Sequence, residues 1–185
     1  SLLARYHQQA LVCTGGERRL AGIWDDERKN TMSRSFLATG LPYAAGTYQR
    51  VEALLDHYAW QWIAMYREAC EATRLRHEQS EGLLDLRMGC LDRRREQMNM
   101  LVTVLARAPD QVVLGNAVEA ISALAPLSSC SDLEALTAVV ASPANPAIRR
   151  TVEVLRARID EAAMLGKAGK FKDGLAVLSS AMEGV

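Results

Sequence analysis

The sequence predicts an all-α fold for this chain of 185 residues. Alanine, leucine, arginine and glutamate, which are good helix formers, are abundant, whereas aromatic residues are few. β-Branched residues are sparse and never alternate with polar residues over the length of a strand. In two long segments, apolar residues instead recur at spacings of three and four, as on the buried face of a helix. These observations favour a helical domain organised around two long helices.

Two short helices are predicted ahead of the long ones. The first covers about residues 17–23. The second begins at Asp25 or Asp26, because either carboxylate can cap the free backbone N–H groups of a first helical turn. It runs to about Thr39, and Gly40 then stands where a glycine commonly ends a helix.

The two long helices are predicted to form an antiparallel hairpin, the spine of the domain. The first begins at a Thr47 cap and runs to about His77, and the second begins at a Ser80 cap and stops before Pro109. At ~1.5 Å per residue, each helix would be about 40 Å long. Their apolar stripes comprise Tyr48, Val51, Leu55, Tyr58, Trp62, Met65, Ala69 and Ala72, then Leu84, Met88, Leu91, Met98, Val102 and Leu105. Leu54 and Trp60 lie off the first stripe and are expected on a second buried face.

Two shorter helices are expected after the hairpin. One starts at Asp110 and ends near Leu124, because Asp110 is a good N-cap residue. The other is capped by Ser131 or Asp132 and runs to about Val140. A connector that contains Cys130 joins them.

The C-terminal segment is predicted to be a helix pair similar to the turn region of a tetratricopeptide repeat. A break over 142–147 precedes it, Pro146 suits the first helical turn, and Gly169 makes the turn between the helices. The first helix is expected to run to about Ala168 with Ile148, Val152, Leu155, Ile159 and Ala163 along one face. Small residues at the helix contact would be Ala162, Gly166 and Ala176, and the second helix's apolar face would be Phe171, Leu175 and Leu178.

One such pair leaves an apolar face uncovered, and in a solenoid the next repeat covers it. The chain therefore divides into a hairpin-based domain, 1–141, and the start of a tetratricopeptide-like repeat, 142–185. The two parts can also pack together as one unit. Because the sequence opens without methionine and ends on this pair, we expect it to be a piece of a longer protein. Residues 1–13 would continue a helix from outside the piece.

The charge balance argues against nucleic acid as a partner. The 22 lysines and arginines equal the 22 aspartates and glutamates, so no net field attracts nucleic acid or an anionic membrane. The basic run at 93–95 is interpreted as a solvated helix face. No stretch approaches the ~18 apolar residues of a membrane span.

No local motif specifies a reaction. The chain lacks a phosphate-binding loop and a dinucleotide fingerprint, and HEQSE at 77–81 has glutamate where the zinc-binding HExxH motif has its second histidine. Cys70 and His77 can share a helix face, but nothing supplies the orienting group or oxyanion site of a cysteine nucleophile. No catalytic, metal-binding or cofactor-binding residue is assigned.

The four cysteines, Cys13, Cys70, Cys90 and Cys130, have no CxxC spacing, so a zinc site is disfavoured. In a cytosolic chain they would be buried thiols, and in an exported chain two disulfides. The residues alone leave these alternatives open.

Charged residues are dense where the two long helices meet. They can be exposed pairs at helical spacing, or a polar patch that contacts a partner. The candidate interaction patch consists of Arg74, Arg76, Glu78, Glu81, Asp85 and Arg87.

A combination of motifs is more specific than any one of them. It comprises Cys13, LAGIWD at 20–25, FLATGLPY at 36–43, REACEATRLRHEQSEGLLDLRMGCLDRR at 67–94, and the stretch 127–132 around Cys130. Together these resemble the segment between the kinase domain and the tetratricopeptide repeats of large bacterial serine/threonine protein kinases of myxobacterial type. The chain itself has no glycine-rich loop, HRD or DFG. The resemblance therefore implies a non-catalytic piece of a kinase.

In family members with a membrane span before this segment, a cytoplasmic kinase places the segment outside the inner membrane. The resemblance thus implies an extracytoplasmic (periplasmic) location, with a cytoplasmic one as the alternative, and two disulfides. Pairing Cys13 with Cys70 and Cys90 with Cys130 is favoured, because it would tie short segments to the spine. Direct pairing of Cys70 with Cys90 is also geometrically possible.

The leading functional hypothesis is a sensory or protein-interaction module of a receptor-like kinase that binds a protein or peptide. The alternative is a purely structural spacer or cap for a tetratricopeptide solenoid. No ligand, cofactor or oligomeric state is assigned.

Overall fold

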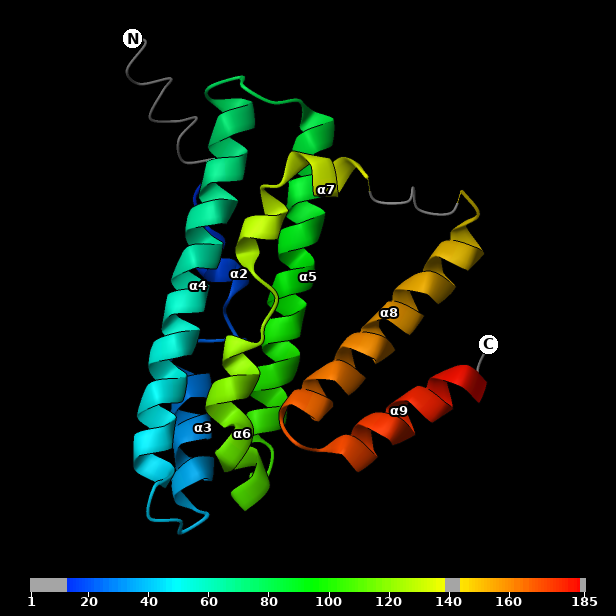
Figure 1. Ribbon diagram of the computed structural model, residues 1–185. Coiled ribbons are helices and arrows are strands. Elements are labelled where there is room, and N and C mark those ends of the chain that lie inside the picture. Colours follow the sequence, from blue (N-terminus) through cyan, green and yellow to red (C-terminus); the bar gives the residue numbers. More distant parts are fainter. Residues whose placement is uncertain (1–12, 139–143, 184–185) are drawn as a thin grey trace.

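The computed structural model describes residues 13–138 and 144–183, and this part of the chain is helical without strands (Figure 1). The predicted all-α class is confirmed. The elements are α2 (Gly16–Arg19), α3 (Asp26–Leu37), α4 (Ala44–Arg74), α5 (Glu81–Ala106), α6 (Gln111–Ser122), the 3₁₀ helix η1 (Leu127–Cys130), α7 (Leu133–Thr137), α8 (Pro146–Lys167) and α9 (Phe171–Glu183). The expected helix over 1–13 and the expected helix end near Val140 fall largely outside the described residues.

The predicted antiparallel hairpin is confirmed and consists of α4 and α5, with 31 and 26 residues. At ~1.5 Å per residue these helices are about 46 and 39 Å long. Helices α3 and α6 pack against both arms at the end away from the bend (Figure 1). Nearer the bend, η1 and α7 lie against the hairpin, and Cys13 is bonded to Cys70 of α4.

Several helix starts follow from local capping chemistry. The carboxylate of Asp25 accepts from Arg28 N at 3.0 Å, so Asp25 rather than Asp26 is the cap. The Ser80 hydroxyl accepts from Leu83 N at 3.2 Å. Caps at the later helices are Asp110, Asp132 and Asn145, each with a side-chain oxygen bound to a first-turn N–H.

The predicted Thr47 cap is wrong. Helix α4 begins three residues earlier at Ala44, and the Thr47 N–H already donates to the Tyr43 carbonyl at 2.9 Å. Thr47 is buried inside the first turn, where its side chain packs rather than caps. At the other end α4 stops at Arg74 instead of His77, because His77 adopts a left-handed backbone, φ 54°. The first short helix likewise ends early, at Arg19, and continues as hydrogen-bonded turns to Trp24.

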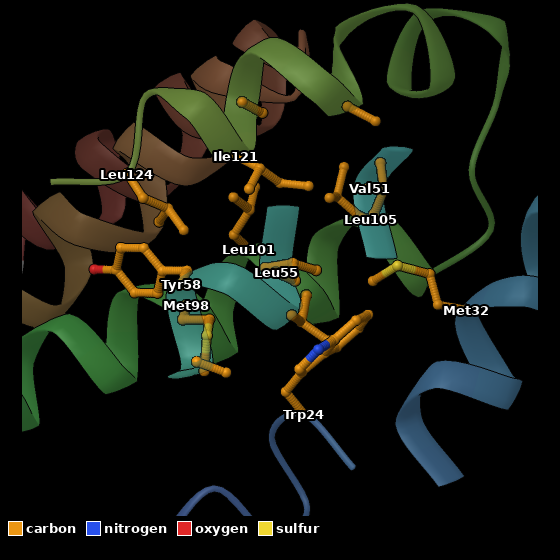
Figure 2. Close-up of a cluster of buried hydrophobic side chains, with 14 of the residues drawn as sticks. Trp24, Met32, Val51, Leu55, Tyr58, Met98, Leu101, Leu105, Ile121 and Leu124 are labelled. Carbon is orange, nitrogen blue, oxygen red and sulfur yellow. The ribbon is translucent and has the colours of Figure 1, made fainter. Parts of the chain in front are cut away.

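The core lies between the lower halves of α4 and α5 and the helices beside them (Figure 2). Its largest fully buried side chains include Trp62, Phe36, Met32, Leu55 and Leu101. The Trp62 indole donates to the Leu91 carbonyl at 2.8 Å, so the one polar atom of this ring is satisfied. The buried residues of α4 nearest the bend are small: Ala69, Cys70, Ala72 and Thr73.

The C-terminal pair packs on the hairpin through one end of α8. Met164 and Ala168 belong to the main core, and Gln97 donates to Asp160 at 3.0 Å. Lys167 Nζ donates to the Ala123 carbonyl, and burial lowers the pKa of this amine. The remainder of α8 diverges from α5 with α9 beside it (Figure 1).

The face predicted for α8 is only partly covered, with Val152 and Leu155 half-buried. Ile148, Ile159 and Ala163 are exposed, because only the C-terminal end of α8 meets α5 and α6. Ala162 is buried at the α8–α9 contact as expected, but Ala176 is exposed. The close residue on α9 is Gly174, where a Cβ would lie 3.0 Å from the Ala162 carbonyl oxygen.

Gly169 makes the predicted turn with φ 81°. A Cβ there would lie 2.7 Å from Val112 Cγ1 and 2.8 Å from Asn116 Nδ2. Gly169→Ala is therefore expected to lower the free energy of unfolding by more than the ~1–2 kcal/mol that a left-handed backbone costs a non-glycine residue.

The matched control is Gly22→Ala, since Gly22 has φ 75° and nothing within 4 Å of the added Cβ. Urea unfolding of both variants by circular dichroism gives the comparison. Equal losses of unfolding free energy in the two variants would show that α6 leaves room for a larger residue at position 169.

Candidate functional site

Two disulfides link the hairpin to its neighbouring segments. Cys13 pairs with Cys70 and Cys90 with Cys130, and the Cα atoms are 5.5 Å apart in each pair. This is the pairing that the family resemblance favours, and it replaces the alternative of free thiols. The first joins the segment before α2 to α4, and the second joins η1 to α5.

Of the six residues of the candidate interaction patch, Arg87 is buried and the other five are exposed. Arg76 is held among acidic side chains, Glu78 at 2.8 Å, Glu68 at 3.1 Å and Glu71 at 3.8 Å, and its pKa is raised chiefly by the Glu78 hydrogen bond. Arg74 pairs with Glu81 at 3.3 Å. These exposed pairs contribute little to stability. Among the described residues Asp85 is exposed and in no ion pair.

Arg87 lies inside the molecule, with 5% of its surface exposed. Its guanidinium donates to the Cys130 carbonyl at 3.3 Å and to Gln79 Oε1 at 3.1 Å, and it forms an ion pair with Glu68. It thus connects both arms of the hairpin, the bend and η1, so its assignment to a surface patch is wrong. Burial with bonds to several partners is what an arginine needs to be tolerated inside a fold.

Gln79 extends this network to α4. Its amide nitrogen donates to the Ala69 carbonyl at 2.8 Å and to the Thr73 hydroxyl at 2.7 Å. The polar side chains at the bend therefore set the positions of α4, α5 and η1 relative to one another.

A groove of about 1050 Å³ lies beside this network, between α4 and the segment 121–133. We call it the α4 groove. Its apolar lining includes Leu54, Met65, Leu83, Leu124, Leu127 and Leu133. Glu68, Glu78, Gln79 and Arg87 line its bend end, and His57 and Gln61 lie on α4.

Trp60 stands on the groove wall with 66% of its surface exposed. Its expected place on a second buried face is wrong, because no helix of the described residues covers the Trp60 side chain. The ring stacks on His57, with centroids 6.4 Å apart. The signal for it was present in the sequence as a tryptophan off the apolar stripe.

Tyr58 fixes one side of the groove. Its hydroxyl donates to the Ala125 carbonyl at 3.1 Å, and burial raises the pKa of Tyr58 to about 12. The phenol therefore stays neutral and keeps the connector after α6 against α4 (Figure 2).

The groove is apolar with a few polar groups at one end, a composition typical of ligand-binding pockets. Among residues 13–138 and 144–183, no three His, Cys, Asp or Glu side chains gather closely enough to hold a metal ion. In the same residues, no helix is both long and apolar enough to cross a bilayer.

No family model, no curated protein and no solved structure matches the chain. The function is therefore argued from the groove and from the sequence motifs.

Proposed function

We propose that the chain is a non-catalytic sensory or protein-interaction module that binds a protein or peptide in the α4 groove. The observation that carries this proposal is an apolar groove with an exposed tryptophan on its wall. Tryptophan is enriched among the residues that dominate binding energies, and apolar concave surfaces are where ligands bind.

The parent protein in this proposal is a receptor-like bacterial serine/threonine kinase. Support comes from the motifs at 20–25, 36–43 and 67–94, which resemble the segment between kinase domain and repeats in such proteins. Two disulfides support an extracytoplasmic location, since such bonds persist in oxidising compartments. Cysteines fully modified by a thiol reagent in intact cells would contradict this location and favour the cytoplasm.

The test is peptide binding with two matched variants. Peptides selected from a display library on the wild-type protein are expected to lose at least ~30-fold in affinity for Trp60→Ala, which corresponds to a hot-spot loss of ~2 kcal/mol. Fluorescence anisotropy of the labelled peptide measures this. Phe171→Ala removes an equally exposed aromatic ring from α9 and is expected to leave binding unchanged.

The same comparison addresses the structural alternative, a spacer or cap for a tetratricopeptide solenoid. The uncovered apolar face of α9, with Phe171, Leu175 and Met182 exposed, favours it. Binding that depends on Phe171 and not on Trp60 would overturn the groove proposal and support a face that the next repeat covers.

A further inference from the structure

Helix α4 presents a second regular stripe to the groove. The lining residues Leu54, Tyr58, Gln61, Met65, Glu68 and Ala72 follow one another at spacings of four and three. This is the spacing of a helix face that packs against another helix. Tyr58, Met65 and Ala72 also belong to the stripe that α4 turns to the core. Leu54, Gln61 and Glu68 belong to the groove stripe alone.

The groove continues the position of α6 along α4. Helix α6 packs on the lower part of α4 and ends at Ser122, and Ile121, Ser122 and Leu124 line one end of the groove. Pro126 and the Cys90–Cys130 disulfide then direct the chain toward α5. The groove follows α4 from Gln61 to Ala72, ~16 Å or three helical turns, with Gln61, Ala64 and Glu68 exposed along it.

The bend end of the groove is acidic. The ion-pair cluster there contains the carboxylates of Glu68, Glu71 and Glu78 and the guanidiniums of Arg76 and Arg87, a formal net charge of −1. Arg87 is buried, whereas the Glu68 and Glu78 side chains are 49% and 59% exposed. A ligand that reaches this end meets carboxylates, and a basic residue complements them.

We infer that the α4 groove receives an amphipathic α-helix of a partner protein. Its apolar residues recur at i, i+3 or i+4, and i+7, and a lysine or arginine lies over Glu68 and Glu78. The bound helix packs against α4 as α6 does, but nearer the bend of the hairpin. This inference rests on the proposed function and specifies its partner.

The experiment uses two display libraries on the whole chain. One consists of 15-residue amphipathic helices randomised at the apolar positions, and the other of 15-residue peptides with proline at every third position, which cannot form a helix. The affinity of each binder for the Gln61→Arg variant is measured to show whether it binds in the groove. This change places a guanidinium under the docked helix, where its desolvation opposes binding.

Gln49→Arg is the matched control, because Gln49 is exposed on the same helix and does not line the groove. Helical binders are expected to weaken at least ~10-fold with Gln61→Arg and to be unaffected by Gln49→Arg. Glu78→Lys is expected to weaken them about fivefold, and reversing the peptide's basic residue to glutamate should recover the loss. Equal thermal midpoints of the variants show that they fold.

The outcomes separate this inference from the function on which it rests. Groove-dependent binders from the proline library mean that the occupant is extended, and they overturn the helix while the groove keeps its function. If helical binders have the same affinity for the Glu78→Lys variant as for the wild type, the proposed basic residue of the partner helix is wrong. If neither library yields binders sensitive to Gln61→Arg, or if the chain self-associates through this groove, both proposals fail.

Discussion

Replacing Cys90 and Cys130 together by serine is expected to abolish peptide binding in the α4 groove and to lower the free energy of unfolding by about 4 kcal/mol. The loss of stability is expected because the disulfide closes a loop of 40 residues and so lowers the entropy of the unfolded chain. The binding term follows from position, because Leu127, Ser128, Ser131 and Leu133 lie within three residues of Cys130 and form one wall. Without the bond, α5 still reaches η1 through the Arg87 hydrogen bond to the Cys130 carbonyl, 3.3 Å, and the Arg94 hydrogen bond to the Ser129 hydroxyl, 3.0 Å.

The control is the double replacement of Cys13 and Cys70. Its loop of 57 residues gives a similar entropic loss, about 4 kcal/mol, yet the segment that it ties to α4, just before α2, supplies no lining residue of the groove. Urea unfolding and peptide anisotropy are measured on both double variants. Together they distinguish a loss of binding caused by a displaced groove wall from one caused by lower stability of the whole domain. Loss of binding in both, or in neither, would mean that the second disulfide has no particular role in shaping the groove.

Trp62→Ala is expected to be the most destabilising single substitution in the hairpin, with a loss of about 3–5 kcal/mol. Trp62 is fully buried between α4 and α5, and its removal leaves a cavity that the surrounding helices cannot fill. Trp62→Phe keeps most of the ring and loses the hydrogen bond to Leu91, so a loss of about 1–2 kcal/mol is expected.

Trp60→Ala is the matched control, since Trp60 is two positions away on the same helix and largely exposed. It is expected to change the free energy of unfolding by less than about 0.5 kcal/mol. Chemical denaturation followed at 222 nm ranks the variants. A loss for Trp60→Ala equal to that for Trp62→Ala would contradict the assignment of Trp60 to an open groove.

Local chemistry was readable in the sequence, and it determined most helix starts. Ser80 and Asp110 cap because each can bond an N–H three residues on, which needs no knowledge of the tertiary fold. Thr47 looked equally suited and is buried instead, since a start at Ala44 already satisfies its N–H. The pairing of hydrophobic stripes likewise followed from periodicity.

Burial that depends on distant segments was not readable. Arg87 and Arg76 both stand in charged stretches of sequence, but η1, 43 residues from Arg87, brings the Cys130 carbonyl to its buried guanidinium. Trp60 is exposed because the chain after α6 turns toward α5. For α8, helical period identified possible faces, but contact with α5 and α6 at one end decided which residues are covered.

The positions of the disulfides also have a consequence for biosynthesis. Many large core side chains, among them Leu55, Leu101 and Leu105, lie toward the end of the hairpin away from the bend, whereas the buried residues around Cys70 are small. Apolar collapse at the open end can therefore align the arms while the thiols are still reduced. We expect oxidation to follow on a chain whose arms are already aligned, which would favour the pairs Cys13–Cys70 and Cys90–Cys130 over a bond between Cys70 and Cys90.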